Sequence, residues 1–169
     1  EVLDTNKEAL KERLGQPLEL KYILDLRDFP GDPHEKCLVK DYKTIAEDEE
    51  VKLVVETMGG VEPAFSFVKA MLEAGKSVTT SNKALVADKG AELIAVAEKH
   101  NANFIFEAAV GGGIPIIRIL RACLTGDVIE EMAGIVNGTT NFMLTSMSEK
   151  GSDYAEVLKE AQDKGYAEK

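Results

Sequence analysis

Five polar residues follow apolar segments of the chain at the points where those segments end. They are Arg27, Thr57, Thr80, Ser81 and Glu107. If the segments are parallel strands, their carboxyl ends meet at one edge of a sheet, where ligands of open α/β folds bind. Hydroxyl, guanidinium and carboxylate groups can all hydrogen-bond a polar ligand. The pattern therefore predicts a small-molecule site assembled from successive strand ends.

Lys83 lies just beyond one of these strand ends, in the sequence Thr80-Ser81-Asn82-Lys83. An ammonium group there can attract a carboxylate or carbonyl oxygen of a substrate. A solvated surface lysine is the alternative from the residue alone. Thr80 and Ser81 can hydrogen-bond the same ligand, while Ser81 or Asn82 also suits the N-cap of a helix that begins at Ala84. The two roles are compatible.

Strands and helices alternate along the chain. Apolar and β-branched segments predict strands at residues 18–26, 51–56, 76–80 and 103–108. Helical periodicity and stop signals predict helices at residues 1–14, 64–74 and 84–100, with a short helix or turn at 44–50. Glycine and proline mark loops at residues 29–34 and 108–114. This alternation is typical of a doubly wound α/β fold, with a parallel sheet covered by helices on both faces.

The pattern changes after Glu107. It predicts a helix from Pro115 to about residue 124, a strand at 128–136, a polar turn at 137–141, and helices at 140–150 and 153–164. We therefore place a domain boundary near Arg118, between residues 1–118 and the start of a second α/β domain at residues 119–169. The second region is too short to bury a core alone.

A phosphate-binding loop is missing from the predicted fold. A dinucleotide-binding fold opens with a strand, a Gly-x-Gly-x-x-Gly turn and a helix. The chain opens on a helix, and neither Gly59–Gly60 nor Gly111–Gly113 spells that turn. The simplest account is a truncated Rossmann-like domain whose first strand and loop precede residue 1.

Composition narrows the class of protein. The formal net charge of −10 disfavours nucleic acid and anionic membranes as partners. No apolar run reaches the roughly 18 residues that span a bilayer, and the charged N-terminal segment does not resemble a signal peptide. Cys37 and Cys123 form no metal-type cluster, so they are expected to be free thiols in a reducing cytoplasm.

Five motifs, in order and spacing, resemble the homoserine dehydrogenase family: ETMGG at residues 56–60, TSNK at 80–83, EAAVGGGIP at 107–115, GIVNGTTN at 134–141 and GYAE at 165–168. The resemblance implies interconversion of aspartate-4-semialdehyde and L-homoserine with NADPH or NADH, in threonine and methionine biosynthesis. It also implies a homodimer in the cytoplasm, or in a plastid for a plant parent. The family's Gly-rich loop and the stretch beyond GYAE, with its proposed general-acid lysine, are not in these residues. The chain alone is therefore expected to be inactive.

The resemblance assigns roles residue by residue. Lys83 matches the active-site lysine. The substrate residues would be Glu168, which holds an ammonium group, with Gly138, Thr139 and Tyr166. The cofactor residues would be Arg27, Thr57, Thr80, Ser81, Lys83 and Gly165. Lys169 stands where many members have proline, a departure that affects the GYAE segment.

Two further expectations depend on the same resemblance. Arg27 favours the 2′-phosphate of NADP, although Asp25 beside it would suit NAD, and a surface Arg–Asp pair is the alternative. Glu107, Val110, Gly112 and Ile114 match a monovalent cation site, expected to hold sodium, three of them through backbone carbonyls. A glycine-rich hinge is the alternative for that segment.

Three other functions stay open. One is a different dinucleotide-fold oxidoreductase of aldehydes or sugars, although no catalytic Glu-Lys-Pro follows the third strand and no cysteine nucleophile is found. A second is a segment of a fused aspartokinase–homoserine dehydrogenase, with or without feedback control. The third is a non-enzymatic module for dimerisation or regulation.

Overall fold

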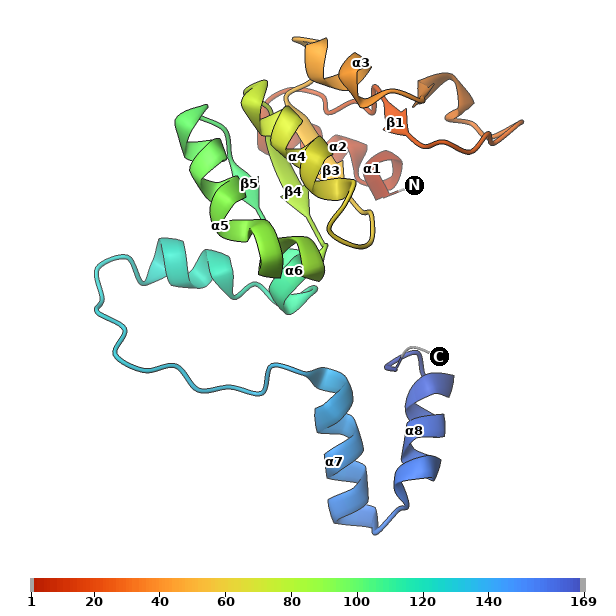
Figure 1. The fold of residues 1–169 in the computed structure, drawn as a ribbon, viewed down its shortest axis with the longest axis vertical. Coiled ribbons are helices and arrows are strands. Elements are labelled where there is room, and N and C mark those ends of the chain that lie inside the picture. The colour runs from red at the N-terminus through yellow and green to blue at the C-terminus, as the bar shows by residue number, and fades with distance from the viewer. Residues whose placement is uncertain (1, 168–169) are drawn as a thin grey trace. The chain divides into compact units, whose positions relative to one another are not determined.

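The computed structural model describes residues 2–167, so the predicted site residue Glu168 lies outside the described part. The chain divides into two compact units, Glu1–Ile119 and Leu120–Lys169. Figure 1 shows the elements of both units with their labels.

A three-stranded parallel sheet forms the centre of the first unit (Figure 1). Its strands are β3 (Leu53–Glu56), β4 (Ser77–Thr80) and β5 (Phe104–Ile105), in the order β3-β4-β5. The register pairs Glu56 with Thr80 and Thr79 with Ile105. The connecting helices are α4 (Ala64–Glu73) and α5 (Lys83–Lys99). The predicted parallel strand–helix alternation is confirmed here.

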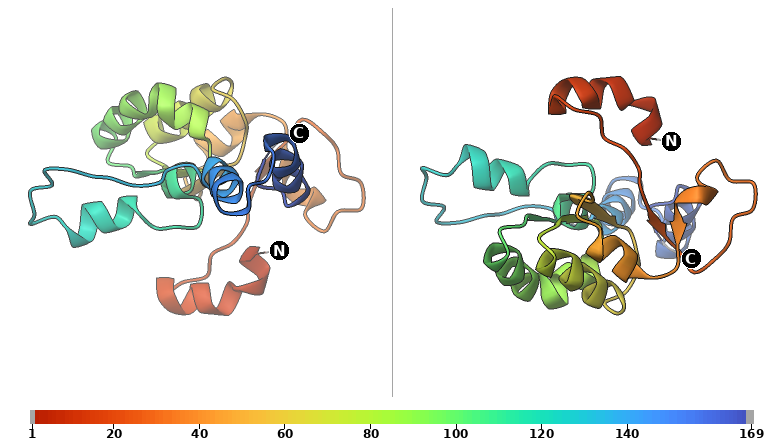
Figure 2. Two further views of the ribbon diagram at one scale, coloured as in Figure 1. Left: turned by 90° about the horizontal axis from the view of Figure 1, so that it is seen from below. Right: turned by 90° about the horizontal axis from the view of Figure 1, so that it is seen from above.

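The two helices lie side by side against one face of the sheet, as Figures 1 and 2 show. Between helices and sheet lies the main apolar core, in which Val68, Leu72, Val78, Leu85 and Leu93 are almost completely buried. Full burial of one such side chain contributes about 1.5–3 kcal/mol relative to leaving it exposed.

The opposite face of the same sheet is open in the described part of the chain. Leu53, Val55 and Ile105 remain more than half exposed, while Val54 and Glu56 alternate with them and face inward. Because successive strand residues point to opposite faces, this alternation separates the core face from the open one. The prediction of helices on both faces is therefore met on one face only within residues 2–167.

A second, smaller parallel sheet precedes the first. It pairs β1 (Ile23–Leu24) with β2 (Leu38–Val39), which is followed by α3 (Tyr42–Glu47). The predicted strand at residues 18–26 is too long, since only two of its residues have a paired partner, and β2 was not predicted. The carboxylate of Asp41 caps α3 by accepting from the Lys43 N–H at 2.9 Å. The short turn or helix predicted at 44–50 thus begins and ends a few residues earlier.

Charged side chains tie α3 to the amino end of the larger sheet. The Lys76 ammonium donates to the carbonyls of Asp48 and Val51 at 2.6 and 3.1 Å, and burial lowers the pKa of Lys76. Asp48 accepts from Lys21 and from the Tyr22 hydroxyl. These hydrogen bonds lower the pKa of Asp48 to about 2. The ionised cluster lies at the opposite end of the strands from Thr80.

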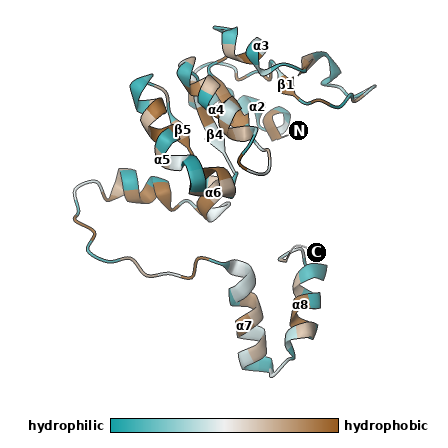
Figure 3. Cartoon of the chain, viewed as in Figure 1, coloured by the Kyte–Doolittle hydropathy of each residue, from teal (hydrophilic) through white to brown (hydrophobic). Residues whose placement is uncertain are grey.

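The predicted N-terminal helix is divided into α1 (Val2–Thr5) and α2 (Lys7–Leu14) by Asn6. Gly15 ends α2 in the left-handed conformation, with φ 71°, which confirms the predicted stop. Neither helix has a buried residue, and α2 is mainly hydrophilic (Figure 3).

Two predictions for residues 108–136 are wrong. Most of the predicted glycine-rich loop is a short helix, α6 (Glu107–Gly111), which ends where Gly112 takes φ 61°. The predicted strand at residues 128–136 does not form, because a strand requires a hydrogen-bonded neighbour and none of the described residues pairs with this segment. The helix predicted after Pro115 is present and ends in a π-helical turn at Ile119–Cys123.

The second unit contains a helical hairpin of α7 (Gly138–Lys150) and α8 (Tyr154–Asp163), as predicted. Asn137 caps α7 by accepting from the Thr140 N–H, and Asp153 caps α8 by accepting from the Ala155 N–H. Val157 and Ala161 are buried on α8. Among the helices of residues 2–167, none is long and apolar enough to cross a membrane.

Candidate functional site

The carboxyl ends of β3 and β4 lie together, as the sequence predicts. Glu56 and Thr80 are register partners, so the residues that follow them leave the sheet at the same edge. The Ser81 N–H donates to the Glu56 carbonyl at 3.4 Å. Thr57, Ser81 and Lys83 are all exposed just beyond this edge. Their backbone and side-chain polar groups can therefore reach a ligand from solvent.

Lys83 is the first residue of α5, and its exposed side chain leaves the helix at the sheet edge. The residue before it caps the helix. Asn82 Oδ1 accepts from the Leu85 N–H at 3.1 Å, which settles the predicted choice between Ser81 and Asn82. The position of Lys83 is thus fixed by a capped helix start.

Thr80 is hydrogen-bonded to other residues at this edge. The residue is 2% exposed, its hydroxyl donates to the Glu56 carboxylate, and its side-chain oxygen accepts from the Asn82 N–H at 2.9 Å. The hydroxyl is therefore hydrogen-bonded inside the protein. The cofactor contact expected of Thr80 stays a prediction.

A chain of hydrogen bonds joins the two loops at this edge. Glu56 also accepts from the Met58 N–H at 2.5 Å, and the Asn82 amide donates to the Gly60 carbonyl at 2.6 Å. Gly60 has φ 76°, a conformation that other residues rarely adopt. Glu56 and Asn82 are buried polar residues that were not among the predicted site residues. For Glu56, the sequence signal that could have indicated a structural role was an acidic residue at an inward-facing position of a predicted strand.

Arg27 forms the surface pair that was the alternative to cofactor binding. Its guanidinium donates to both carboxylate oxygens of Asp25 at 3.0 and 2.8 Å and lies 5.1 Å from the Phe29 ring centroid. Hydrogen bonds from Arg27 hold the pKa of Asp25 well below its usual range, and Asp25 raises the pKa of Arg27. The side chain of Arg27 remains 76% exposed, so one face can still meet an anion.

Glu107 starts α6 and binds backbone N–H groups. Its carboxylate accepts from Ile116, Ile117 and Arg118, which begin the next helical segment. Desolvation raises the pKa of Glu107, but these hydrogen bonds outweigh it, so the pKa lies below its ordinary value. In residues 2–167 no three carboxylate, histidine or cysteine side chains gather to hold a metal. The predicted sodium site would therefore depend mainly on the carbonyls of Val110, Gly112 and Ile114.

The NGTT turn and the start of GYAE lie together in the second unit. Gly138 begins α7, and the Thr139 hydroxyl donates to the Tyr166 carbonyl. The Phe142 ring meets Tyr166 edge-on, with ring centroids 5.2 Å apart. Gly165, with φ 74°, turns the chain after α8 so that Tyr166 reaches α7. Glu168 belongs to the same motif but lies outside the described residues.

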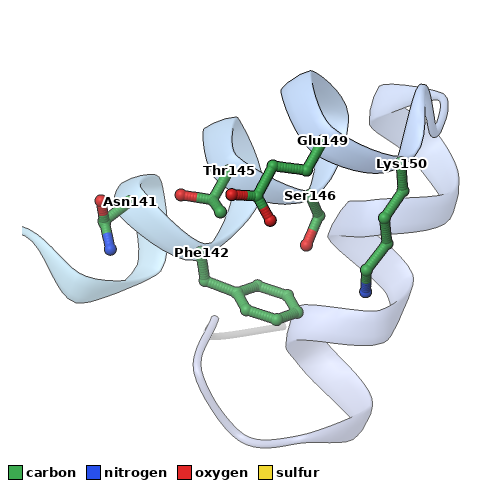
Figure 4. A pocket seen from close by; sticks show the side chains of 6 residues that line it. All are labelled: Asn141, Phe142, Thr145, Ser146, Glu149 and Lys150. Carbon is green, nitrogen blue, oxygen red and sulfur yellow. The ribbon is translucent and has the colours of Figure 1, made fainter.

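A shallow groove of about 330 Å³ runs along α7 beside this contact. Figure 4 shows its lining residues, Asn141, Phe142, Thr145, Ser146, Glu149 and Lys150. Phe142 and Ser146 are directed toward α8, the Glu149 carboxylate bends back toward Thr145 and Ser146, and the Lys150 ammonium lies at the far end (Figure 4). The groove is continuous with the predicted substrate turn through Asn141 and Phe142.

Comparison with known proteins matches both parts of the chain to one family. Residues 3–107 match the model for the homoserine dehydrogenase NAD-binding domain, and residues 115–169 match the homoserine dehydrogenase model. The homoserine dehydrogenase of Corynebacterium glutamicum is 47% identical over 95% of this chain and 37% of its own length. The Bacillus subtilis enzyme is 40% identical over 99% of this chain and 39% of its own length.

Solved structures agree with the sequence matches. The crystal structure of a homoserine dehydrogenase from Thiobacillus denitrificans is 42% identical, with a TM-score of 0.84, over 99% of this chain and 39% of that protein. A hyperthermophilic archaeal homoserine dehydrogenase in complex with NADPH is 29% identical, with a TM-score of 0.68. The match covers 98% of this chain and 47% of that protein. The chain thus spans less than half the length of these relatives. With both family models matched in succession over residues 3–107 and 115–169, the chain belongs to the homoserine dehydrogenase family.

Proposed function

We propose that the chain is part of an NAD(P)-dependent homoserine dehydrogenase that interconverts aspartate-4-semialdehyde and L-homoserine. The observation that carries the proposal is the succession of the two family matches, with Lys83 at the shared edge of β3 and β4. Residues 1–118 would form the cofactor domain, and residues 119–169 would begin the catalytic domain. A homodimer in the cytoplasm and a role in threonine and methionine biosynthesis are parts of the same proposal.

The exposed groups at the sheet edge fit a nicotinamide cofactor. Thr57, Ser81 and Lys83 present polar groups to solvent beyond the carboxyl ends of the strands, where such cofactors bind. The bound cofactor supplies or accepts the hydride in this reaction. The ammonium of Lys83 attracts the carbonyl oxygen of the substrate and stabilises the negative charge that develops on it.

The second unit is proposed to hold the substrate. Gly138 permits close approach of the backbone, and Thr139 and Tyr166 set the shape of the turn. Glu168 is proposed to bind the substrate ammonium, for which a carboxylate is the natural partner. Sodium at the carbonyls of Val110, Gly112 and Ile114, with Glu107, remains a proposal as well.

A chimeric enzyme tests the proposed function directly. In it, this chain replaces the matching 163 residues of the Corynebacterium glutamicum homoserine dehydrogenase. We expect the chimera to reduce NADP or NAD with homoserine, followed at 340 nm, and the 169-residue chain alone to show no turnover. A chimera with normal circular dichroism and no activity would contradict the proposed function. Robust turnover by the chain alone would contradict its predicted inactivity.

Arg27 is proposed to favour NADP over NAD, in line with the NADPH complex of the archaeal relative. In the chimera, Arg27→Gln should weaken NADPH binding about tenfold, since a charge-assisted hydrogen bond contributes roughly 1.5–3 kcal/mol, part of which Asp25 already takes. NADH binding should change less than twofold. Fluorescence titration with both cofactors measures this, and Arg13→Gln on exposed α2 is the control. Equal weakening of both cofactors would exclude a 2′-phosphate contact.

A further inference from the structure

We propose that Asn82 is a positioning residue for Lys83, with Glu56 as its anchor. Neither residue is among those that the sequence motifs assign to cofactor or substrate. The inference rests on the proposed function, because it takes Lys83 to face the reacting groups. It concerns how the first turn of α5 is held at the sheet edge.

The side-chain oxygen, the side-chain nitrogen and the backbone N–H of Asn82 each form a hydrogen bond within the protein. Oδ1 accepts from the Leu85 N–H at 3.1 Å, Nδ2 donates to the Gly60 carbonyl at 2.6 Å, and the backbone N–H donates to Thr80 Oγ1 at 2.9 Å. The residue is 6% exposed. The observed contacts of Asn82 are thus with its neighbours in the chain. One amide joins the helix start to the loop after β3.

Glu56, the last residue of β3, anchors the hydrogen bonds of Asn82 to the sheet. Its carboxylate is buried, and its two oxygens accept from the Met58 N–H and from the Thr80 hydroxyl. Burying a carboxylate is costly unless it is well hydrogen-bonded. Here both bonds go to groups that shape the exits of β3 and β4. The sheet, the loop at Met58 to Gly60, and the helix start thus form one hydrogen-bonded unit.

Lys83 follows Asn82 directly and has a long, exposed side chain. The position of its backbone is therefore the main constraint on where the ammonium can reach. When the link from Asn82 to Gly60 is lost, the loop and the helix start stay joined only through Glu56 and Thr80, so they can shift more easily relative to one another. A displacement of about 1 Å at a reacting centre can lower a rate by up to about 100-fold.

A double-mutant cycle in the chimera separates positioning from general stability. Asn82→Ser keeps a good helix cap and removes the bond to Gly60, and we expect about a tenfold loss in kcat/KM. In a Lys83→Ala background, assayed with micromolar enzyme, the same change should lower kcat/KM less than twofold, since coupled residues are not additive. Asp41→Ser, a cap exchange on α3, is the control and should leave kcat/KM unchanged in both backgrounds.

Equal losses in both backgrounds would overturn the inference and leave Asn82 a purely structural residue. So would a loss smaller than twofold when Lys83 is present. An unmutated chimera without activity is a different result, since it contradicts the proposed function and with it the premise of this inference.

A second variant tests the geometry without relying on turnover. Asn82→Asp keeps the cap but places a carboxylate oxygen against the Gly60 carbonyl, so it should loosen the loop at least as much as serine. In the 169-residue chain, hydrogen exchange of the Met58 amide, whose N–H donates to Glu56, should become at least tenfold faster in both variants. Exchange in the middle of α5 should stay within twofold. Unchanged exchange of the Met58 amide would overturn the proposal.

Discussion

Replacing Lys83 by alanine is expected to lower kcat/KM of the chimera by about 100- to 1,000-fold, the usual effect of removing one group that stabilises developing charge. We expect this effect because Lys83 is exposed at the start of α5, next to the carboxyl ends of β3 and β4. Lys83→Arg should recover only part of the activity, because a guanidinium keeps the charge but not the compact shape of an ammonium. Initial rates at 340 nm in both reaction directions measure the effect.

The control for this change is Lys99→Ala, at the exposed last turn of the same helix. It removes the same charge far from the strand exits and should change kcat/KM less than twofold. If Lys83→Ala lowers activity no more than Lys99→Ala does, Lys83 has no part in the reaction. The family match would stand, but the proposed role of the TSNK segment would not.

Replacing Leu72 by alanine is expected to lower the free energy of unfolding by about 2–5 kcal/mol, the range for leucine truncation in well-packed cores. Leu72 lies on α4, is fully buried, and packs in the apolar cluster between the helices and the sheet. Domains are stable by only about 5–15 kcal/mol, so this loss is a large share of the total. Urea unfolding of the 169-residue chain, followed by circular dichroism, measures it.

Leu53→Ala is the matched control, because Leu53 is a leucine of the same sheet that is 57% exposed on the open face. Its replacement should lower the free energy of unfolding by less than about 0.5 kcal/mol, as is usual for surface substitutions. Equal shifts in the urea midpoint for the two variants would mean that the buried face of the sheet is not the one described.

The sequence predicted most of what depends on local pattern. The strands at residues 51–56 and 76–80 and the helices at 64–74 and 84–100 recur in the structure with small shifts of their ends. Stop signals such as Gly15 are local as well. The parallel register then brings Thr57 and Ser81 to the same edge, which is why that part of the site could be inferred.

The predictions that are wrong depend on partners that pattern cannot supply. The segment at residues 128–136 has a strand's composition, but strand structure also needs a neighbouring strand. The hydrogen bonds of Thr80 could not be predicted for a similar reason. Its position at a strand end suggested ligand binding, which stays a prediction, but nothing in the local pattern indicated that its hydroxyl bonds Glu56 and Asn82. The partner of a polar group is decided by the tertiary fold.

The segment at residues 128–136 is expected to be cleaved by proteases more readily than the helices and strands of the chain. Val128, Ile135 and Val136 are at least 78% exposed, and within residues 2–167 no backbone hydrogen bond involves this segment. A peptide bond must be extended and unpaired to enter a protease cleft, a state that helices reach only by opening locally. Cleavage here would cut no helix or strand and would expose no buried side chain of α4 or α8. The lack of backbone partners, which explains why the predicted strand does not form, thus also marks the segment where cleavage would disturb the least structure.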